Sequence, residues 1–381
     1  MANPFRVGEH VTGAFFTDRA DEVARVRRGM TDPARLLVYG PRRIGKSSVI
    51  AVAAEGARKE GALVVRADLS TVTTYLDITS RLLRSLYHET RSLELRLEEL
   101  FRGLRPKVTL TPDPSGGAPG ISFGVERRTA GPEEQRSSLD SVVERLDGIG
   151  ASEGRPVAVV LDEFQAIHDL GGEPAEWHLR DLIQRHGGLS FVCAGSRETL
   201  IHEMLGSKRA FYKMFEHVHV GPMPRDHFAR WIENRLATAS PVEPGLGFAV
   251  LNAAGPRTQD VLQVARQLWF RARGLARPLR KGDVAAALED VVRNEEPVIR
   301  ALWHELADHQ QDVLRVVALG ADQLFSAGTR DRYGLPAASS IQRAVEALLG
   351  RSLLVRQEDG LAFDSPFVEA WVHRETAPDL G

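Results

Sequence analysis

The stretch that decides the fold lies at residues 40–47 and reads Gly40-Pro41-Arg42-Arg43-Ile44-Gly45-Lys46-Ser47. The apolar run at 35–39 before it is typical of a buried strand, and good helix formers follow it from Ser47 to Lys59. In a Gly-x₄-Gly-Lys-Ser pattern the glycines let backbone N–H groups wrap phosphates, and the following helix presents its positive N-terminus. The strand, loop and helix together predict a phosphate-binding loop (Walker A), against the alternative of a surface turn that contains glycine and lysine.

Two side chains of this loop have defined tasks in such a site. Lys46 reaches the β- and γ-phosphates, and the Ser47 hydroxyl is a ligand of Mg²⁺. The pair Arg42-Arg43 has two interpretations: its guanidinium groups approach phosphate or a partner carboxylate, or they point to solvent. We expect the nucleotide to be held by the loop residues Gly40, Pro41, Arg42, Arg43, Ile44, Gly45, Lys46, Ser47 and Ser48.

Two carboxylates follow the apolar run Pro156–Leu161, which is typical of a central parallel strand covered on both faces. Asp162 and Glu163 would then emerge at the carboxyl edge of the sheet, beside the phosphates. We expect Asp162 to hold Mg²⁺ through a water molecule and Glu163 to polarise the attacking water for in-line transfer. The alternative is a helix N-terminus that simply favours acidic residues. Because the first motif requires such a partner (Walker B), the sequence predicts a Mg²⁺-dependent ATPase.

Strands and helices alternate in the first half of the chain. Further strands are predicted at Ala62–Val65, with Asp68 where the strand ends, and at Leu189–Ala194. Helices of about ten or more residues separate the strands, which indicates an α/β domain with a parallel sheet. An insertion at about 106–136 interrupts this pattern. Its alternating residues on either side of a Pro/Gly/Ser-rich tip predict a hairpin.

The signals for strands stop at about Pro224. Residues 225–296 are predicted to form consecutive helices. After Pro297 a third pattern begins, in which further helices lead to a hairpin at Leu353–Phe363 that turns at Asp359-Gly360. The chain is therefore expected to consist of three regions.

The last of these regions fits a winged helix. One helix is predicted at Gln310–Leu319, and a short helix with a turn at Asp331–Ser340. Ser339 would then cap a recognition-like helix that extends to Leu348.

The side chains of this region leave its partner open. Gln342 and Arg343 would reach base edges, and Arg351 and Arg356 would lie near a DNA backbone. Residues 301–381, however, hold seven Lys/Arg and twelve Asp/Glu, a net charge of −5. Phosphate neutralisation supplies most non-specific affinity for DNA. The charge therefore favours a protein-docking or interdomain regulatory wing over a DNA-binding one.

The composition excludes several classes of protein. The 381 residues carry a formal charge of −2 and no polybasic tail, so nothing global indicates a nucleic-acid or membrane partner. The single cysteine, Cys193, excludes an intramolecular disulfide and a cysteine-based zinc cluster. No apolar run is long enough to span a bilayer, and the start of the chain lacks the apolar segment of a signal peptide. We expect a soluble, cytoplasmic protein.

Taken together, these motifs resemble the archaeal-type ATPase family, a branch of the AAA+/STAND P-loop proteins of archaea and bacteria. The resemblance rests on matches along almost the whole chain: Phe16-Thr17-Asp18-Arg19 with Glu22, Gly40–Ser48, Asp162-Glu163-Phe164-Gln165, Gly195-Ser196, and Phe363 to Trp371. It implies an α/β P-loop core at 1–224, a helical lid at 225–296 and a C-terminal winged helix at 297–381.

The resemblance also implies roles for single residues. Phe16 and Arg19 match the N-terminal box that packs near the adenine. Ser196 matches the first sensor, which would bind the γ-phosphate or the attacking water. Arg257 matches the second sensor and would reach the γ-phosphate through closure of the lid; the alternative is a surface arginine beside a helix cap. Relatives often carry an arginine finger before the strand that leads into the lid. Arg209 is the candidate here, and its alternative is a solvated basic loop.

Two classes of function follow from these motifs. In the first, the protein hydrolyses ATP slowly and acts as a conformational switch, whose output passes through the winged helix to a protein partner or within a homo-oligomer. In the second, it is a DNA-handling ATPase of the origin-initiator or mobile-element-associated type. A module that binds the nucleotide without turnover is a third alternative.

Overall fold

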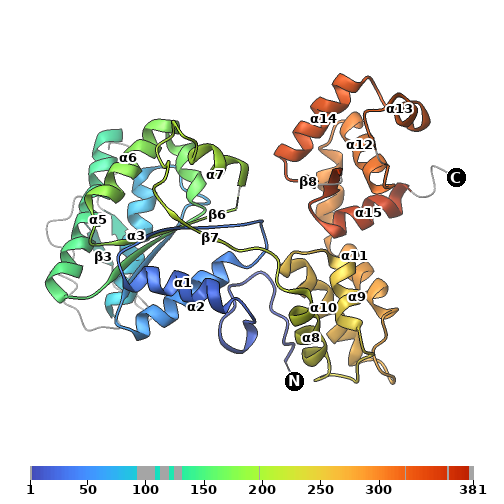
Figure 1. Cartoon of the computed structure of the whole chain (residues 1–381), viewed down its shortest axis with the longest axis horizontal. Coiled ribbons are helices and arrows are strands. Elements are labelled where there is room, and N and C mark those ends of the chain that lie inside the picture. Colours follow the sequence, from blue (N-terminus) through green and yellow to red (C-terminus); the bar gives the residue numbers. More distant parts are fainter. Residues whose placement is uncertain are drawn as a thin grey trace. The chain divides into compact units, whose positions relative to one another are not determined.

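The computed structural model describes residues 2–91, 108–111, 120–123, 131–196, 198–321, 323–357 and 360–376. The chain forms two compact units (Figure 1). His10–Gly221 make up the first, which we call the sheet unit. Met1–Glu9 and Pro222–Gly381 make up the second, which we call the helical unit.

A five-stranded sheet with the order β2-β5-β6-β1-β7 is the centre of the sheet unit. Its strands are β1 (Arg35–Tyr39), β2 (Leu63–Asp68), β5 (Val157–Asp162), β6 (Ser190–Gly195) and β7 (Glu216–His219). All neighbouring pairs are parallel, and β5 and β6 are buried along their whole length. The parallel sheet predicted from the sequence is therefore confirmed. The strands predicted at 62–65 and 189–194 correspond to β2 and β6.

Helices cover both faces of this sheet, and the alternation of side chains along each strand decides which layer a residue joins. Leu36 and Val38 of β1 belong to the core formed with α1 (Ala20–Thr31) and α2 (Lys46–Lys59). Leu37 belongs to the core on the opposite face. The helices of that second core are α3 (Tyr75–Arg91), α5 (Pro132–Glu153) and α6 (Gly172–Arg185). The remaining short helices of the unit are η1 (Gly13–Phe15), η2 (Phe164–Leu170) and α7 (Glu198–Met204).

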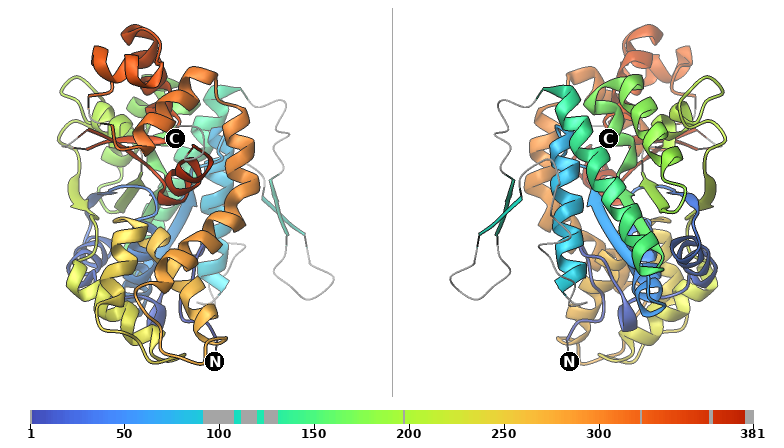
Figure 2. Two further views of the ribbon diagram at one scale, coloured as in Figure 1. Left: turned by 90° about the vertical axis from the view of Figure 1, so that its right-hand side faces the viewer. Right: turned by 90° about the vertical axis from the view of Figure 1, so that its left-hand side faces the viewer.

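A separate antiparallel hairpin lies in the insertion. β3 (Val108–Thr111) pairs with β4 (Gly120–Phe123), which confirms the hairpin predicted within 106–136. Figure 2 shows the two strands side by side. The tip at 112–119 lies outside the described residues.

The glycine that follows β1 is required by a close approach between two chain segments. Gly40 has a φ of +153°, and a Cβ at this position would lie 2.2 Å from the carbonyl oxygen of Val220. The N–H of Val220 donates to the carbonyl oxygen of Tyr39 at 2.8 Å. The first residue of the loop is thereby held against the segment that follows β7.

We expect Gly40→Ala to lower the free energy of unfolding by about 1–3 kcal/mol, because the added methyl group overpacks this contact. Denaturation in urea measures the change. Gly148→Ala is the matched control, since Gly148 is exposed in α5 and a Cβ there meets nothing within 4 Å. Alanine favours the helix, so the control should be neutral or slightly stabilised. Equal changes in the two variants would contradict the close approach at Gly40.

The helical unit consists of helices around one continuous core, with a small hairpin toward its end. Its elements are α8 (Arg225–Leu236), α9 (Leu246–Ala254), α10 (Thr258–Ala272), α11 (Asp283–His304), α12 (Asp308–Ala318), α13 (Ala327–Tyr333), α14 (Ala338–Gly350), β8 (Leu354–Gln357), β9 (Gly360–Phe363) and α15 (Pro366–Thr376). The described part of the chain contains no helix that is long and apolar enough to cross a membrane.

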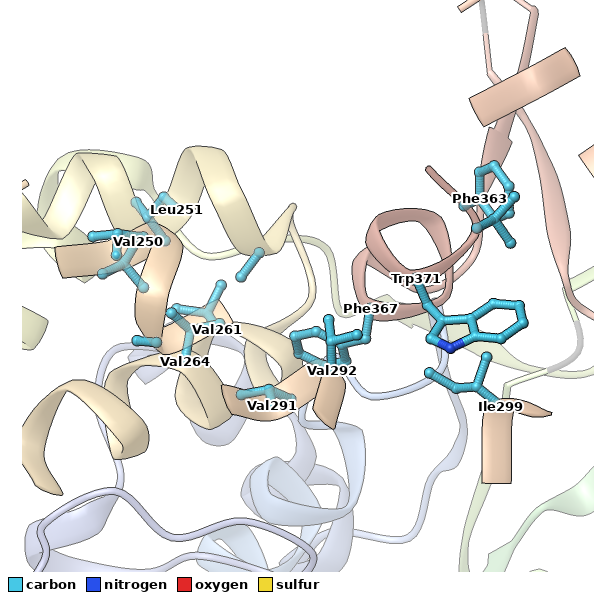
Figure 3. Packing of buried hydrophobic residues seen from close by; sticks show 14 of the residues in the cluster. Val250, Leu251, Val261, Val264, Val291, Val292, Ile299, Phe363, Phe367 and Trp371 are labelled. Carbon is cyan, nitrogen blue, oxygen red and sulfur yellow. The ribbon is translucent and has the colours of Figure 1, made fainter. Parts of the chain in front are cut away.

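The helix α11 runs through Pro297, where the sequence predicts a change of pattern. A proline inside a helix removes one backbone hydrogen bond, so packing on both sides of it must support the helix. Figure 3 shows Val292 of α11 beside Phe367 of α15, and Ile299 of α11 beside Trp371. All four side chains are buried in the same core. The core therefore continues across this position, and the three-part division of the chain stays a prediction.

The start of α14 corrects one detail of the predicted winged helix. The helix begins at Ala338 with Ala337 as its N-cap, so Ser339 is not the cap. Ser339 lies in the first turn, where backbone N–H groups have no intrahelical partner and serine is tolerated. In the wing, β8 and β9 pair as predicted, with Gln357 opposite Gly360. Asp359 of the predicted turn lies outside the described residues.

Candidate nucleotide-binding site

The loop after β1 closes around the amino group of Lys46. Positive φ angles at Arg43 (+64°) and Gly45 (+106°) turn the chain so that α2 begins at Lys46. The residue is 7% exposed, and its Nζ donates to the carbonyl oxygens of Gly40 at 2.8 Å and Pro41 at 2.7 Å. A buried ammonium group is thus fastened to the loop, next to the positive N-terminus of α2.

The two oxygen ligands predicted for Mg²⁺ meet in the structure. The Ser47 hydroxyl donates to Asp162 Oδ2 at 3.2 Å, although 115 residues separate them along the chain. The other carboxylate oxygen, Oδ1, accepts from the N–H of Glu163 at 3.1 Å. Hydroxyl and carboxylate oxygens are the hard donors that Mg²⁺ prefers, so these residues fit the ion.

Glu163 lies between two side chains that donate to its carboxylate. The Ser196 Oγ is 3.1 Å and 2.9 Å from the two carboxylate oxygens, and the Gln165 amide donates to Oε2. Glu163 directly follows β5 and Ser196 directly follows β6, which are neighbouring parallel strands. Parallel strands deliver the residues after them to one edge of the sheet. The structure therefore brings the predicted water-polarising residue and the predicted first sensor into contact.

The role of Gln165 is not predicted by the sequence, although the residue is part of the Asp-Glu-Phe-Gln motif. It is 3% exposed. A Cβ at Gly195 would lie 2.5 Å from Gln165 Oε1, so the glycine at the end of β6 leaves room for the amide. The signal that could have revealed this role is a polar residue two positions after Glu163, at the start of an otherwise apolar segment.

The residues that match the N-terminal box lie beside the loop and the core next to it. Arg19 is 4% exposed, and its guanidinium donates to the carbonyl oxygen of Ile44 at 3.2 Å. Phe16 is partly buried against the core shared by α1 and α2. The Ser48 hydroxyl accepts from the N–H of Val11 at 3.2 Å. These contacts connect the start of the sheet unit to the loop and to the first turn of α2.

The other predicted arginines lie in different surroundings. Arg42 and Arg43 are exposed. Arg209 pairs with the fully buried carboxylate of Glu176 at 2.5 Å and with Glu173 at 3.4 Å. The hydrogen bond to Glu176 raises the pKa of the Arg209 guanidinium. Arg209 must leave both carboxylates before it can act on the nucleotide of a neighbouring molecule.

One charged residue of the site, Arg66 of β2, is not predicted by the sequence. Its guanidinium forms an ion pair with Asp162 Oδ2. Side chains alternate along a strand, so Arg66 projects from the same face as Val64, which belongs to the core with α2. The sequence signal was a charged residue inside an otherwise apolar strand. Which partner it meets depends on the sheet order, in which β2 and β5 are neighbours.

Arg257, the predicted second sensor, lies in the helical unit at the N-cap of α10. It forms an ion pair with Asp364, which directly follows β9. The two side chains are 11% and 16% exposed, so solvent screens the pair only weakly. Arg257 thus connects α10 to the segment that follows the wing hairpin.

The arginines that would contact a DNA backbone have carboxylate partners. Arg351 pairs with Glu305 at 2.7 Å, and Arg356 pairs with Glu346 at 2.8 Å. Arg343 is exposed on α14. The positive charges of Arg351 and Arg356 are therefore locally neutralised, in addition to the acidic balance of the region.

The sheet order, the loop around Lys46 and the carboxylates after β5 define the class: this is a P-loop protein with a nucleotide-binding ATPase domain. Residues 19–192 match the family described as AAA ATPase domain, and residues 298–374 match the family described as Probable winged helix domain. The chain thus contains an AAA ATPase domain followed by a winged helix domain. The predicted AAA+ ATPase domain and C-terminal winged helix are confirmed.

Solved structures share this fold over the whole chain. The Walker-type ATPase PABY2304 of Pyrococcus abyssi has a TM-score of 0.67 and 16% sequence identity, covering 97% of this chain and 99% of that chain. The Aeropyrum pernix ORC1 protein, solved in complex with DNA, has a TM-score of 0.51 and 14% identity, covering 96% and 95%. At these identities the likeness establishes the fold. None of the curated proteins matches the sequence.

Proposed function

We propose that the protein binds ATP with Mg²⁺, hydrolyses it slowly, and shifts its lid and winged helix with the state of the nucleotide. The observation that carries this proposal is the ion pair between Arg257 and Asp364. It puts the candidate γ-phosphate sensor in direct contact with the winged-helix region. A switch needs such a link between the residue that reads the nucleotide and the domain that delivers the output.

In this proposal the loop and the first turn of α2 hold the triphosphate. Backbone N–H groups and Lys46 receive the phosphates, and Ser47 and Asp162 hold Mg²⁺. When bound, the ion supplies positive charge that stabilises the transferring phosphoryl group. The support for these roles is the buried ammonium group at the loop and the contact between Ser47 and Asp162.

Glu163 orients the attacking water in this proposal. The donors Ser196 and Gln165 fix the direction of its carboxylate. Slow turnover suits a switch that must persist in its ATP-bound state.

Arg257 reports the γ-phosphate by changing partners. A guanidinium group that is paired with a shielded carboxylate must leave it to bind a phosphate, so Asp364 and ATP compete for Arg257. ADP lacks the γ-phosphate and does not compete. The acidic balance of the winged-helix region and the paired arginines Arg351 and Arg356 favour a protein partner, or a second copy of the chain, as the target of the output.

The exchange predicts that Asp364→Asn will increase the preference for ATP over ADP. Removing the competing carboxylate frees Arg257 for the γ-phosphate, and couplings of this kind change an affinity by about 5- to 150-fold. Competition binding against a fluorescent nucleotide gives both dissociation constants. Asp312→Asn is the matched control, because Asp312 pairs with Arg315 on α12 at 2.9 Å. If the ratio of the ATP and ADP affinities is unchanged in Asp364→Asn, Arg257 does not exchange Asp364 for the γ-phosphate.

A further inference from the structure

Arg66 places a positive charge beside Asp162, the carboxylate that is proposed to hold Mg²⁺. Its guanidinium pairs with Asp162 Oδ2, the same oxygen that accepts the hydrogen bond from Ser47. The Asp162 side chain is 8% exposed and the Arg66 side chain 28%. Because the pair is largely shielded from solvent, any other cation that approaches this carboxylate must share it with Arg66.

The fold holds Arg66 in this position. β2 is an edge strand of the sheet, and its register with β5 sets Asp68 opposite Asp162. Arg66 therefore lies two residues before the level of the carboxylate and reaches toward the carboxyl edge. Its backbone N–H faces away from β5 and donates to the Ser85 hydroxyl of α3 at 2.8 Å. This hydrogen bond fastens the edge strand at the residue that carries the guanidinium.

One titratable neighbour of Arg66 is His10, which lies at the start of the sheet unit. Partial burial lowers the pKa of His10, and the positive charge of Arg66 lowers it further. The lowered pKa disfavours a second positive charge at His10. The next residue, Val11, donates to the Ser48 hydroxyl, which positions this segment beside the first turn of α2. Asp162 is the carboxylate that pairs directly with Arg66.

We propose that Arg66 is a positioning residue that sets the Mg²⁺ dependence of nucleotide binding. Paired with Arg66, Asp162 offers a free divalent cation little net charge, so Mg²⁺ enters together with the nucleotide. The guanidinium also screens Asp162 from the phosphates, so ATP binds without Mg²⁺ more tightly than it would beside an unpaired carboxylate. This inference rests on the proposed function, in which ATP is the nucleotide.

The test compares the affinity for a fluorescent ATP analogue in Mg²⁺ and in EDTA, so it does not depend on hydrolysis. In Arg66→Met the affinity in EDTA should fall, and the Mg²⁺ concentration for half-maximal binding should also fall. We expect the ratio of the affinity in Mg²⁺ to the affinity in EDTA to rise about tenfold or more. The reason is that the variant leaves one unit of negative charge unpaired at Asp162. Arg66→Gln is a second neutral variant with the same expected result.

Two control variants separate this role from a structural one. Arg66→Lys keeps the positive charge and should keep the ratio within about threefold of the wild-type value. Arg58→Met removes an arginine that pairs with Glu89 at the far end of α2, and it should leave the ratio unchanged. A wild-type ratio in folded Arg66→Met and Arg66→Gln would overturn the inference. Failure of the wild-type protein to bind ATP would overturn the proposed function instead.

Discussion

Lys46→Ala is expected to lower the affinity for ATP by roughly 10²- to 10⁴-fold, the equivalent of two charge-assisted hydrogen bonds of about 1.5–3 kcal/mol each. The Lys46 amino group is buried and already lies against the carbonyl oxygens of Gly40 and Pro41. The variant loses the cation that meets the β- and γ-phosphates. It also loses the two hydrogen bonds that hold the start of the loop to α2.

Isothermal titration with ATP and Mg²⁺ measures this effect directly. Lys59→Ala is the matched control, because Lys59 is exposed at the last residue of the same helix and is distant from the loop. Denaturation in urea shows whether the loop variant is still folded at the assay temperature. A folded Lys46→Ala protein with wild-type affinity for ATP would contradict the assignment of the site.

Glu163→Gln is expected to slow ATP hydrolysis by about 10²- to 10⁴-fold, the usual contribution of a positioned general base. Glutamine has nearly the same shape and keeps an oxygen that accepts from Ser196, so the geometry of the edge should survive. Its amide cannot take a proton from water. Binding of ATP should change little, because Lys46, Ser47 and Asp162 remain.

Release of phosphate under steady-state conditions gives the rate, and titration with ATP gives the affinity. Glu144→Gln serves as the control, since Glu144 is exposed on α5. Equal rates in the wild type and in Glu163→Gln would remove Glu163 as the catalytic residue. A variant that binds ATP without hydrolysing it would also hold the proposed switch in one state for structural work.

The sequence predicts the parts of the site that depend on residue spacing within one continuous segment. A strand, a Gly-x₄-Gly-Lys-Ser loop and a helix form one continuous segment, so the position of Lys46 follows from spacing alone. Asp162 and Glu163 follow a buried strand, and Ser196 follows another. Because carboxyl ends of parallel strands share one edge, the sequence predicts that Asp162 lies at the same edge of the sheet as Ser47.

The sequence does not predict the partners that depend on which distant segments become neighbours. Arg66 meets Asp162 because β2 pairs with β5, and Arg257 meets Asp364 across 107 residues. The sequence leaves Arg209 either as an arginine finger or as part of a solvated basic loop, and its buried partner Glu176 comes from α6. Pro297 suggests a break, yet α11 continues because the core on both sides supports the helix. Each of these outcomes is decided by tertiary packing, which a residue pattern does not contain.

The continuity of α11 through Pro297 also has a mechanical consequence. A helix of 22 residues is about 33 Å long at 1.5 Å per residue. Its two halves share one core with no loop between them. A tilt of about 10° at Asp283 would sweep the far end at His304 through roughly 6 Å. A small movement of the first turn of α11 is thus enlarged at its last turn.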